Sequence, residues 1–243
     1  MKVLIELPTW LGDCVMATPA IENIVNFDND TQITLIGSFV SIEALKNHPE
    51  VVKTVVLSKK YRDLVKISKE LGDFDIFFSF RSSIRSKFLK FFISAENKYQ
   101  FDKNTYQNRH QVEKYNDFVN DSLSINLTAK KLQIYGYSTS KNKKKILGIN
   151  PGASYGSAKR WYPEEFAKVA GELSSQYDIV IFGGPGEKDI AMDIEKSLLE
   201  KGIDNYQNLA ANTTIPELID HISKLDLFIT GDSGPMHVAA AFQ

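Results

Sequence analysis

Short apolar runs alternate with longer amphipathic stretches along the whole chain, and this alternation limits the folds open to it. Runs such as Val3–Leu7 and Gln32–Ile36 have the length and composition of buried strands, and each precedes a stretch with helical periodicity. Strands that alternate with helices form parallel sheets, because a parallel connection needs a crossover that a helix usually supplies. The sequence therefore predicts an α/β protein.

We expect the strands and helices in two series, separated by a linker. In the first series the expected strands are Val3–Leu7, Gln32–Ile36, Val51–Leu57 and Ile76–Phe80, and the expected helices are Cys14–Phe27, Ser41–Asn47, Leu64–Leu71, Ser83–Phe92 and Gln107–Leu123. In the second series they are strands Ile146–Asn150, Asp178–Phe182, one near Tyr206 and Leu227–Thr230, and helices Pro163–Gln176, Lys188–Lys201 and Ile215–Lys224. The polar, basic stretch 138–145 is typical of a surface linker. We predict two domains, 1–140 and 141–243.

Charge, cysteine content and hydropathy exclude several classes of protein. The formal net charge of −1 gives no sign of a nucleic-acid binder, so we expect no nucleic-acid partner. Cys14 is the only cysteine, which excludes an intramolecular disulfide and suits a cytoplasmic location. No segment reaches the ~20 apolar residues of a membrane span. The first apolar run, broken by Glu6 and Pro8, is too short for a signal peptide.

The first strand-to-helix turn, residues 7–14, carries the carboxylate of Asp13. This turn has neither the glycines of a dinucleotide-binding turn nor the lysine of a P-loop. Ligands bind at the carboxyl ends of strands in open α/β sheets, so Asp13 stands where a catalytic base could act. The simpler interpretation is a helix N-cap, because aspartate is favoured there and its charge offsets the helix dipole. The residues alone leave both interpretations open.

A second candidate loop, residues 150–161, follows the first strand of the second series. Its small residues would let the backbone approach a ligand, and Lys159 is a compact partner for a phosphate. An ordinary solvated loop whose Trp161 packs on the sheet would have the same composition.

Two further loops connect strands to helices in the second series. Residues 182–187 form a glycine-rich turn that ends in Glu187, a pattern that many such loops share. The loop 230–237 contains Asp232, Ser233, Gly234 and His237. The backbone N–H groups and the helix dipole at its end would suit a diphosphate, although His237 could equally be a buried core histidine. Together the three loops favour a nucleotide or another phosphorylated ligand.

These motifs resemble those of the ADP-heptose:lipopolysaccharide heptosyltransferases, glycosyltransferase family 9. The loop 151–161 looks like the signature loop of the second enzyme of this family, heptosyltransferase II. Residues 231–237 resemble the family's block of aspartate, serine or threonine, glycine, two variable positions and histidine. Leu11-Gly12-Asp13 followed by Thr18-Pro19 is similar to its N-terminal block. The resemblance runs from the first strand to the last residue.

The resemblance implies a GT-B fold of two Rossmann-like domains, with the acceptor on residues 1–140 and ADP-heptose on residues 141–243. It implies that Asp13 is the general base and that Lys159 faces the donor diphosphate. The substrate-binding residues it implies are Glu187 at the adenosine ribose, and Asp232, Ser233, Gly234 and His237 around the donor's sugar and phosphates. Tyr155 departs from the threonine found at that place in the first heptosyltransferase.

The implied reaction is inverting transfer of heptose from ADP-heptose to a hydroxyl of a heptose–Kdo–lipid A acceptor, in the inner core of lipopolysaccharide or lipooligosaccharide. No metal or other cofactor is expected, because Lys159 and a helix N-terminus would stabilise the leaving diphosphate. Asp73-Phe74-Asp75 looks like a metal-binding Asp-x-Asp but directly precedes an expected strand. The alternatives are transfer to Kdo as by heptosyltransferase I, a nucleotide-sugar epimerase of the same fold, and a non-catalytic nucleotide-binding protein.

Residues 81–103 combine six basic side chains with two acidic ones. They are interleaved with large apolar residues, namely Phe88, Phe91, Phe92 and Ile93. The simpler interpretation is a solvated helix with one core face. The alternative is a surface that docks phosphorylated lipid A or an anionic membrane, which would make the protein peripheral to the inner leaflet of the inner membrane.

We also expect the second domain to be incomplete. The sequence stops a few residues into the helix that follows Asp232, with neither a glycine nor an asparagine cap. The expectation is that the chain as given binds ADP-heptose poorly and exposes apolar surface.

Overall fold

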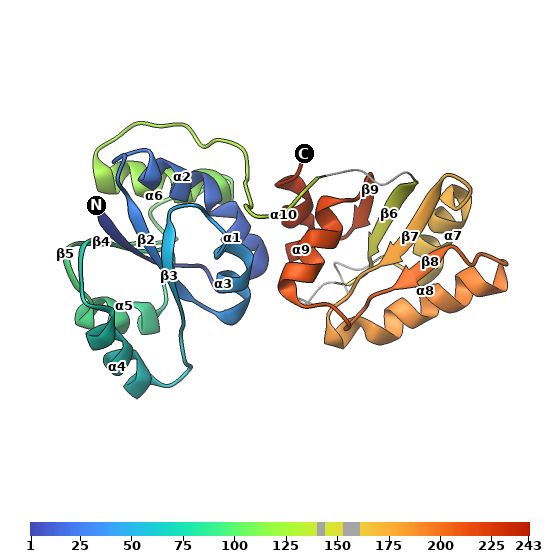
Figure 1. Cartoon of the computed structure of the whole chain (residues 1–243), viewed down its shortest axis with the longest axis horizontal. Coiled ribbons are helices and arrows are strands. Elements are labelled where there is room, and N and C mark those ends of the chain that lie inside the picture. The colour runs from blue at the N-terminus through green and yellow to red at the C-terminus, as the bar shows by residue number, and fades with distance from the viewer. Residues whose placement is uncertain (140–143, 153–160) are drawn as a thin grey trace. The chain divides into compact units, whose positions relative to one another are not determined.

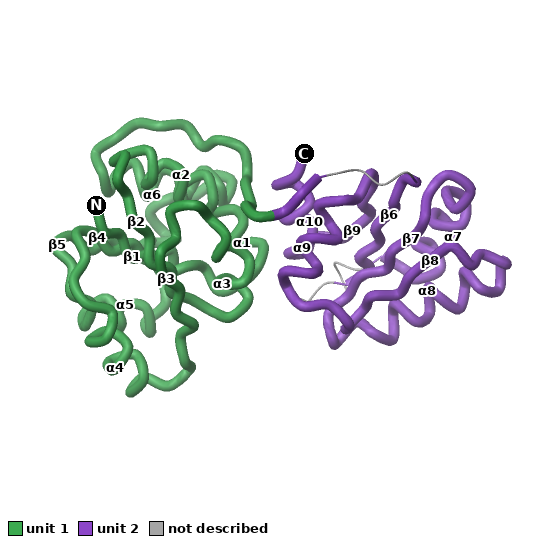
Figure 2. Tube along the Cα trace, viewed as in Figure 1, with its two compact units in different colours: residues 1–136 green, residues 137–243 purple. Residues whose placement is uncertain are grey.

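The computed structural model of the chain consists of two compact units, Met1–Gly136 and Tyr137–Gln243 (Figure 2). The structure describes residues 1–139, 144–152 and 161–243. Its division lies just before the expected boundary at residue 140, and each unit has a parallel sheet of its own.

Unit 1 is a five-stranded sheet with helices on both faces (Figure 1). The strand order is β3-β2-β1-β4-β5, and the four pairings are parallel. Its strands are β1 (Lys2–Glu6), β2 (Gln32–Gly37), β3 (Val51–Val56), β4 (Asp73–Ser79) and β5 (Ser94–Gln100). Its helices are α1 (Leu11–Met16), α2 (Thr18–Val25), α3 (Phe39–Leu45), α4 (Tyr61–Leu71), α5 (Ile84–Phe92) and α6 (Gln111–Leu123).

The two faces of this sheet are packed by different helices. Phe77 on β4 belongs to a buried cluster with Leu64 of α4 and Leu89 of α5. The next residue, Phe78, contacts Phe118 of α6, with ring centroids 5.9 Å apart. Successive strand residues point to opposite faces, so a strand covered on both sides is apolar throughout. This explains why the central strands were readable as continuous apolar runs.

Two expectations for this unit are wrong. The expected helix Cys14–Phe27 is divided into α1 and α2 at Ala17, with Pro19 in the first turn of α2, where a missing N–H group is harmless. Residues 94–100, expected within a basic helical region, form the strand β5. This strand is an edge of the sheet and none of its residues is fully buried, so it lacks the apolar composition that marks a buried strand.

Buried asparagines hold the segment after α6 against the helices of unit 1. The side-chain amide of Asn23 on α2 donates to the side-chain oxygen of Asn116 (2.7 Å). Asn116 and Asn120 on α6 both donate to the carbonyl of Leu127 (2.7 and 2.8 Å). Since buried polar groups are costly when unpaired, this network fixes the path of the segment.

The end of this segment, up to Gly136, the last residue of unit 1, is also held against the helices of the unit. The Tyr135 hydroxyl donates to Glu22 of α2 (3.1 Å). Gly136 has φ +86°, and a Cβ there would lie 2.7 Å from the side-chain nitrogen of Asn47. Both facts demand glycine at this position.

Unit 2 is a four-stranded parallel sheet in the order β8-β7-β6-β9. Its strands are β6 (Lys145–Asn150), β7 (Tyr177–Ile181), β8 (Tyr206–Asn208) and β9 (Leu227–Thr230). Its helices are α7 (Pro163–Leu173), α8 (Lys188–Glu200), α9 (Ile215–Ser223) and α10 (Gly234–Ala240), with a 3₁₀ turn at Pro185–Glu187. In its main core, Leu147 and Ile149 of β6 pack against residues of α7 and α8.

The first residues of unit 2 are tied to its last helices. The ring of Tyr137 lies against Phe242, with centroids 6.3 Å apart, and the Ser223 hydroxyl at the end of α9 donates to the carbonyl of Ser138 (3.1 Å). Among the described residues, no helix is both long and apolar enough to cross a membrane.

We expect Asn116→Ala to lower the free energy of unfolding by about 1–3 kcal/mol, because it removes the nearer acceptor of the buried Asn23 amide and one of the two amide donors to the Leu127 carbonyl. Asn97→Ala, at an exposed position of β5, is the matched control and should cost less than about 0.5 kcal/mol. Urea unfolding measures both, and equal costs would contradict the structural role of Asn116.

Candidate active site

A pocket of about 600 Å³ lies at the carboxyl ends of β1, β4 and β5 in unit 1. It is lined by Pro8, Thr9, Trp10, Asp13, Phe80, Arg81, Ser82, Ser83, Ile84, Lys87, Phe101, Asp102, Lys103, Asn104, Gln111 and Tyr115. This edge of an open α/β sheet is where ligands bind, so the location agrees with the one expected for Asp13.

Asp13 lies in the first turn of α1, half-buried in the pocket wall. The N-cap residue of α1 is Trp10, whose side chain makes no capping hydrogen bond. The simpler interpretation of Asp13 as the N-cap is therefore wrong, although its charge still lies at the favourable end of the helix dipole. Burial, with the charge of Asp13 as the next cause, raises the pKa of the neighbouring Tyr115, which keeps this phenol neutral.

Beneath the pocket lies a fully buried carboxylate that the sequence did not identify as functional. Glu6, the last residue of β1, accepts hydrogen bonds from the hydroxyls of Ser79 (2.6 Å) and Ser86 (2.9 Å). The guanidinium of Arg81, which lines the pocket, lies 3.5 Å from Glu6 Oε1, the oxygen that also accepts from Ser86. Burial raises the pKa of Glu6, and these hydrogen bonds and the charge of Arg81 offset the rise only in part.

The pocket carries more positive than negative side chains. Arg81, Lys87 and Lys103 line it, against Asp13 and Asp102. Positive groups that converge in a concave site attract anions, so the pocket suits an anionic ligand. From the sequence, Arg81 was considered only as one of the six basic residues of the stretch 81–103. Its position directly after a buried strand and Phe80 was the signal that could have singled it out.

In unit 2 the corresponding edge is organised by Asn150, which sequence reasoning also passed over. This buried residue ends β6. Its side-chain amide donates to Thr230 Oγ1 (3.3 Å), to Ser233 Oγ (3.2 Å) and to the carbonyl of Gly152 (3.3 Å). Asn150 therefore connects the loop after β6 with the loop after β9.

Glu187 occupies the same edge, at the end of the 3₁₀ turn after β7. Its carboxylate accepts a hydrogen bond from the backbone N–H of Gly184 (2.7 Å). It also lies so close to Gly152 that a Cβ there would be 1.9 Å from Glu187 Cδ. The absence of a side chain at Gly152 thus allows the Glu187 carboxylate to lie against it.

The remaining expected residues of unit 2 that the structure describes lie on helix α10 or directly before it. Ser233 is the N-cap of α10, Asp232 precedes it at an exposed position, and Gly234 and His237 lie within this helix, half-buried. Asn150 and Glu187 come to the same edge from β6 and β7. Lys159 and Tyr155 lie outside the described residues.

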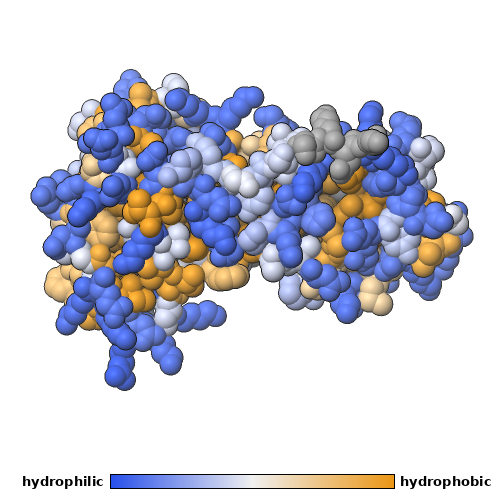
Figure 3. All heavy atoms as spheres, viewed as in Figure 1, coloured by the Kyte–Doolittle hydropathy of each residue, from blue (hydrophilic) through white to orange (hydrophobic). Residues whose placement is uncertain are grey.

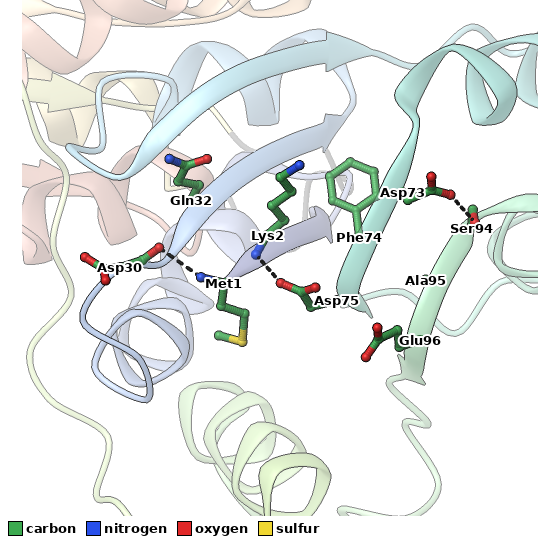
Figure 4. Close-up of a pocket in the computed structure, with 10 residues that line it drawn as sticks. All are labelled: Met1, Lys2, Asp30, Gln32, Asp73, Phe74, Asp75, Ser94, Ala95 and Glu96. Atoms are coloured by element: carbon green, nitrogen blue, oxygen red, sulfur yellow. Dashed lines mark hydrogen bonds between the residues drawn. The ribbon is translucent and has the colours of Figure 1, made fainter.

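Another pocket, of about 750 Å³, lies at the opposite edge of the unit 1 sheet (Figure 4). It contains the Asp-x-Asp pair, and both carboxylates have structural partners: Asp75 accepts from the backbone N–H of Lys2 (2.6 Å), and Asp73 from the hydroxyl of Ser94 (2.6 Å). Asp73 begins β4, so the pair lies within the strand and not, as was expected, directly before it. Within the described part of the chain, no three His, Cys, Asp or Glu side chains are grouped to hold a metal.

Comparison with known proteins agrees with this architecture. The family model of glycosyltransferase family 9 (heptosyltransferase) matches residues 65–243. Lipooligosaccharide heptosyltransferase 2 of Campylobacter jejuni is 44% identical over the whole chain, which covers 78% of that relative. Lipopolysaccharide heptosyltransferase 1 of Campylobacter coli is 24% identical, over 99% of this chain and 81% of the length of that relative. The solved structure of ADP-heptose lps heptosyltransferase II of Escherichia coli superposes with a TM-score of 0.85 at 21% identity, covering 100% of this chain and 82% of that one.

Two parallel α/β units, each with ligand-type residues at the carboxyl ends of its strands, give the chain the GT-B type of fold. The chain belongs to glycosyltransferase family 9, the heptosyltransferases. Both the enzyme class and the fold expected from the motifs are confirmed.

We expect Asn150→Asp to destabilise unit 2 by about 1–3 kcal/mol, because it replaces a donor by an acceptor that faces three oxygen atoms. Asn212→Asp makes the same change at an exposed position and should be nearly neutral. Thermal unfolding with hydrogen exchange on unit 2 compares them. If Asn150→Asp exchanged and melted like the control, Asn150 would not connect the two loops.

Proposed function

We propose that this chain transfers heptose from ADP-heptose to the inner-core heptose of lipopolysaccharide or lipooligosaccharide, with inversion at the transferred sugar. The observation that carries the proposal is the position of Asp13 in a basic pocket at the carboxyl edge of the sheet. The chain is also 44% identical to a heptosyltransferase 2 and only 24% identical to a heptosyltransferase 1, which favours the second type of transfer.

Unit 1 would hold the acceptor. A heptose–Kdo–lipid A acceptor carries carboxylate and phosphate groups, which Arg81, Lys87 and Lys103 can neutralise in the pocket. Glu6 holds Arg81 from below, so the guanidinium is restrained before the acceptor binds. The acceptor hydroxyl would then face Asp13.

Unit 2 would hold the donor. Glu187 is the residue proposed for the adenosine ribose, since a carboxylate accepts hydrogen bonds from the ribose hydroxyls. Asp232, Ser233, Gly234 and His237 would surround the donor's sugar and phosphates. Lys159 would stabilise the diphosphate.

The reaction would proceed by direct displacement at the anomeric carbon. The acceptor oxygen forms the new bond to this carbon, its proton passes to Asp13, and the bond to the diphosphate oxygen breaks. The sugar develops oxocarbenium-like charge, and ADP leaves with the bonding electrons. Lys159 would stabilise the charge on the leaving diphosphate, so we propose that no metal or other cofactor takes part.

We also propose that the protein acts in the cytoplasm, at the inner leaflet of the inner membrane, because the acceptor is an anionic glycolipid. No nucleic acid is proposed as a partner, in keeping with the net charge of −1.

The decisive experiment incubates the chain with ADP-heptose and, in parallel, with Kdo–lipid A and heptose–Kdo–lipid A. Release of ADP with a one-heptose gain on the second acceptor supports the proposal. A gain on the first acceptor alone would assign transfer to Kdo instead. Conversion of the nucleotide sugar without acceptor would indicate an epimerase, and ADP binding without any reaction a non-catalytic protein.

Asp13→Asn should retain the fold and lower kcat by at least about 10²-fold, because asparagine cannot accept the proton. The matched control is Asp75→Asn, at the opposite edge of the sheet, which should leave kcat unchanged. Steady-state kinetics and circular dichroism compare the two. A folded Asp13→Asn protein with near-normal turnover would remove Asp13 from the reaction.

Gly152→Ala should weaken ADP binding by about tenfold or more, because the added methyl group displaces the Glu187 carboxylate. Gly186→Ala is its control, since a Cβ there meets no atom within 4 Å. Calorimetry with ADP measures both variants. Equal affinities would show that Glu187 does not contact the nucleotide.

Transfer should persist in excess EDTA at an unchanged rate, because positive side chains rather than a metal stabilise the diphosphate. The control is the same assay with Mg²⁺ or Mn²⁺ added back. Loss of activity in EDTA with recovery on metal addition would contradict the proposed mechanism.

A further inference from the structure

The surface formed by α4, α5 and the turn before α4 combines exposed apolar side chains with positive charge. On α5, Ile84 is 81% exposed and Phe91 is 79% exposed. With Lys87 they are spaced three and four residues apart, so the three side chains share one face of the helix. The opposite face, with Leu89, is buried in the core of unit 1.

Aromatic contacts make this surface continuous with α4. Phe88 lies against Tyr61, the first residue of α4, with ring centroids 5.1 Å apart. Phe92 contacts both Phe88 (4.9 Å) and Phe91 (5.1 Å). Tyr61 itself remains half-exposed. In Figure 3, the surface over β3, α4 and α5 mixes hydrophobic and hydrophilic side chains.

The charge of this surface differs from that of the whole chain. Helix α5 carries three basic residues and no acidic one. Residues 59–70 add five basic residues against two acidic ones. The chain as a whole has a net charge of −1, so positive charge is concentrated here. Exposed aromatic and aliphatic groups surrounded by basic side chains match an anionic lipid surface.

The same helix also reaches the pocket that contains Asp13. Ile84 and Lys87 line this pocket at the start of α5, and Phe91 lies two turns further along the same face. A glycolipid acceptor has its acyl chains in the bilayer and its sugars at the bilayer surface. A protein docked through α5 would therefore have the mouth of its pocket at the depth of those sugars.

We propose that unit 1 docks on an anionic phospholipid bilayer through α4 and α5, with Phe91 as the principal apolar contact. This surface, called here the α4–α5 surface, consists of Tyr61, Ile84, Phe91 and Phe92 with the basic residues of 59–69 and of α5. The reason for docking rests on the proposed function, because a glycolipid acceptor lies in the bilayer. The α4–α5 surface itself lies beside Asp13 and the other groups proposed to react.

Vesicle sedimentation provides the direct measurement. The protein should bind vesicles of phosphatidylethanolamine and phosphatidylglycerol at low salt and bind pure phosphatidylcholine vesicles much more weakly.

Phe91→Ser should lower the partition coefficient about tenfold, and Phe91→Leu should restore most of it. Raising the salt from 0.05 to 0.5 M should also weaken binding, because the charges are exposed. Met192→Ser and Leu199→Ser, at residues 52% and 56% exposed on α8 of unit 2, are matched controls that should bind like the unchanged protein.

Transfer assays separate docking from chemistry. Phe91→Ser should transfer heptose normally to a deacylated, water-soluble acceptor, and several-fold more slowly to an acylated acceptor in vesicles.

Equal binding to neutral and anionic vesicles, or equal binding by Phe91→Ser and the α8 controls, would overturn the proposal. So would a change from dimer to monomer in Phe91→Ser without vesicle binding, which would assign the surface to a second copy of the chain. If the unchanged protein bound anionic vesicles but transferred to neither acceptor, the proposed function would fail and the docking surface would stand.

Discussion

Strand β1 lies between β2 and β4 and pairs in parallel with both, and the organisation of unit 1 depends on these two pairings. Parallel pairing places the carboxyl ends of neighbouring strands at one edge. The turns after β1 and β4 therefore open side by side and bring Asp13 and Arg81 into one pocket, although they are far apart in the sequence. Both faces of the sheet must then be covered by helices, which is why α5 has one face in the core and another free for a partner.

The same pairing accounts for the buried charge beneath the pocket. The register of β1 with β4 sets Glu6 beside Ser79, and the first turn of α5 adds Ser86. Two hydroxyl donors and the Arg81 guanidinium make a carboxylate tolerable where no water reaches it. An uncompensated charge at this depth would be strongly destabilising. The Glu6 carboxylate gives the Arg81 guanidinium a fixed partner within the protein, and the rest of the guanidinium lines the pocket.

Most of the fold was predictable because its strands are buried on both faces and therefore apolar throughout. What failed depends on information that is not local. Strand β5 is polar because it is an exposed edge, and only its pairing with β4 makes it a strand. Glu6 looked like an interruption of an apolar run, because its partner Ser79 is adjacent only through strand register. Asn150 was passed over for the same reason: two of its partners, Thr230 at the end of β9 and Ser233 just after it, lie in a distant part of the sequence.

The restraints around Gly136 have a mechanical consequence. The chain is held to unit 1 up to Tyr135, through the asparagine amides and Glu22, and it is held to unit 2 from Tyr137 and Ser138 onward. The two sets of contacts are separated by one residue. Because Gly136 has φ +86° and a Cβ there would lie 2.7 Å from the side-chain nitrogen of Asn47, any larger residue would push the chain away from Asn47. One substitution at this position would therefore strain the last restraint of unit 1 and the first restraint of unit 2 together.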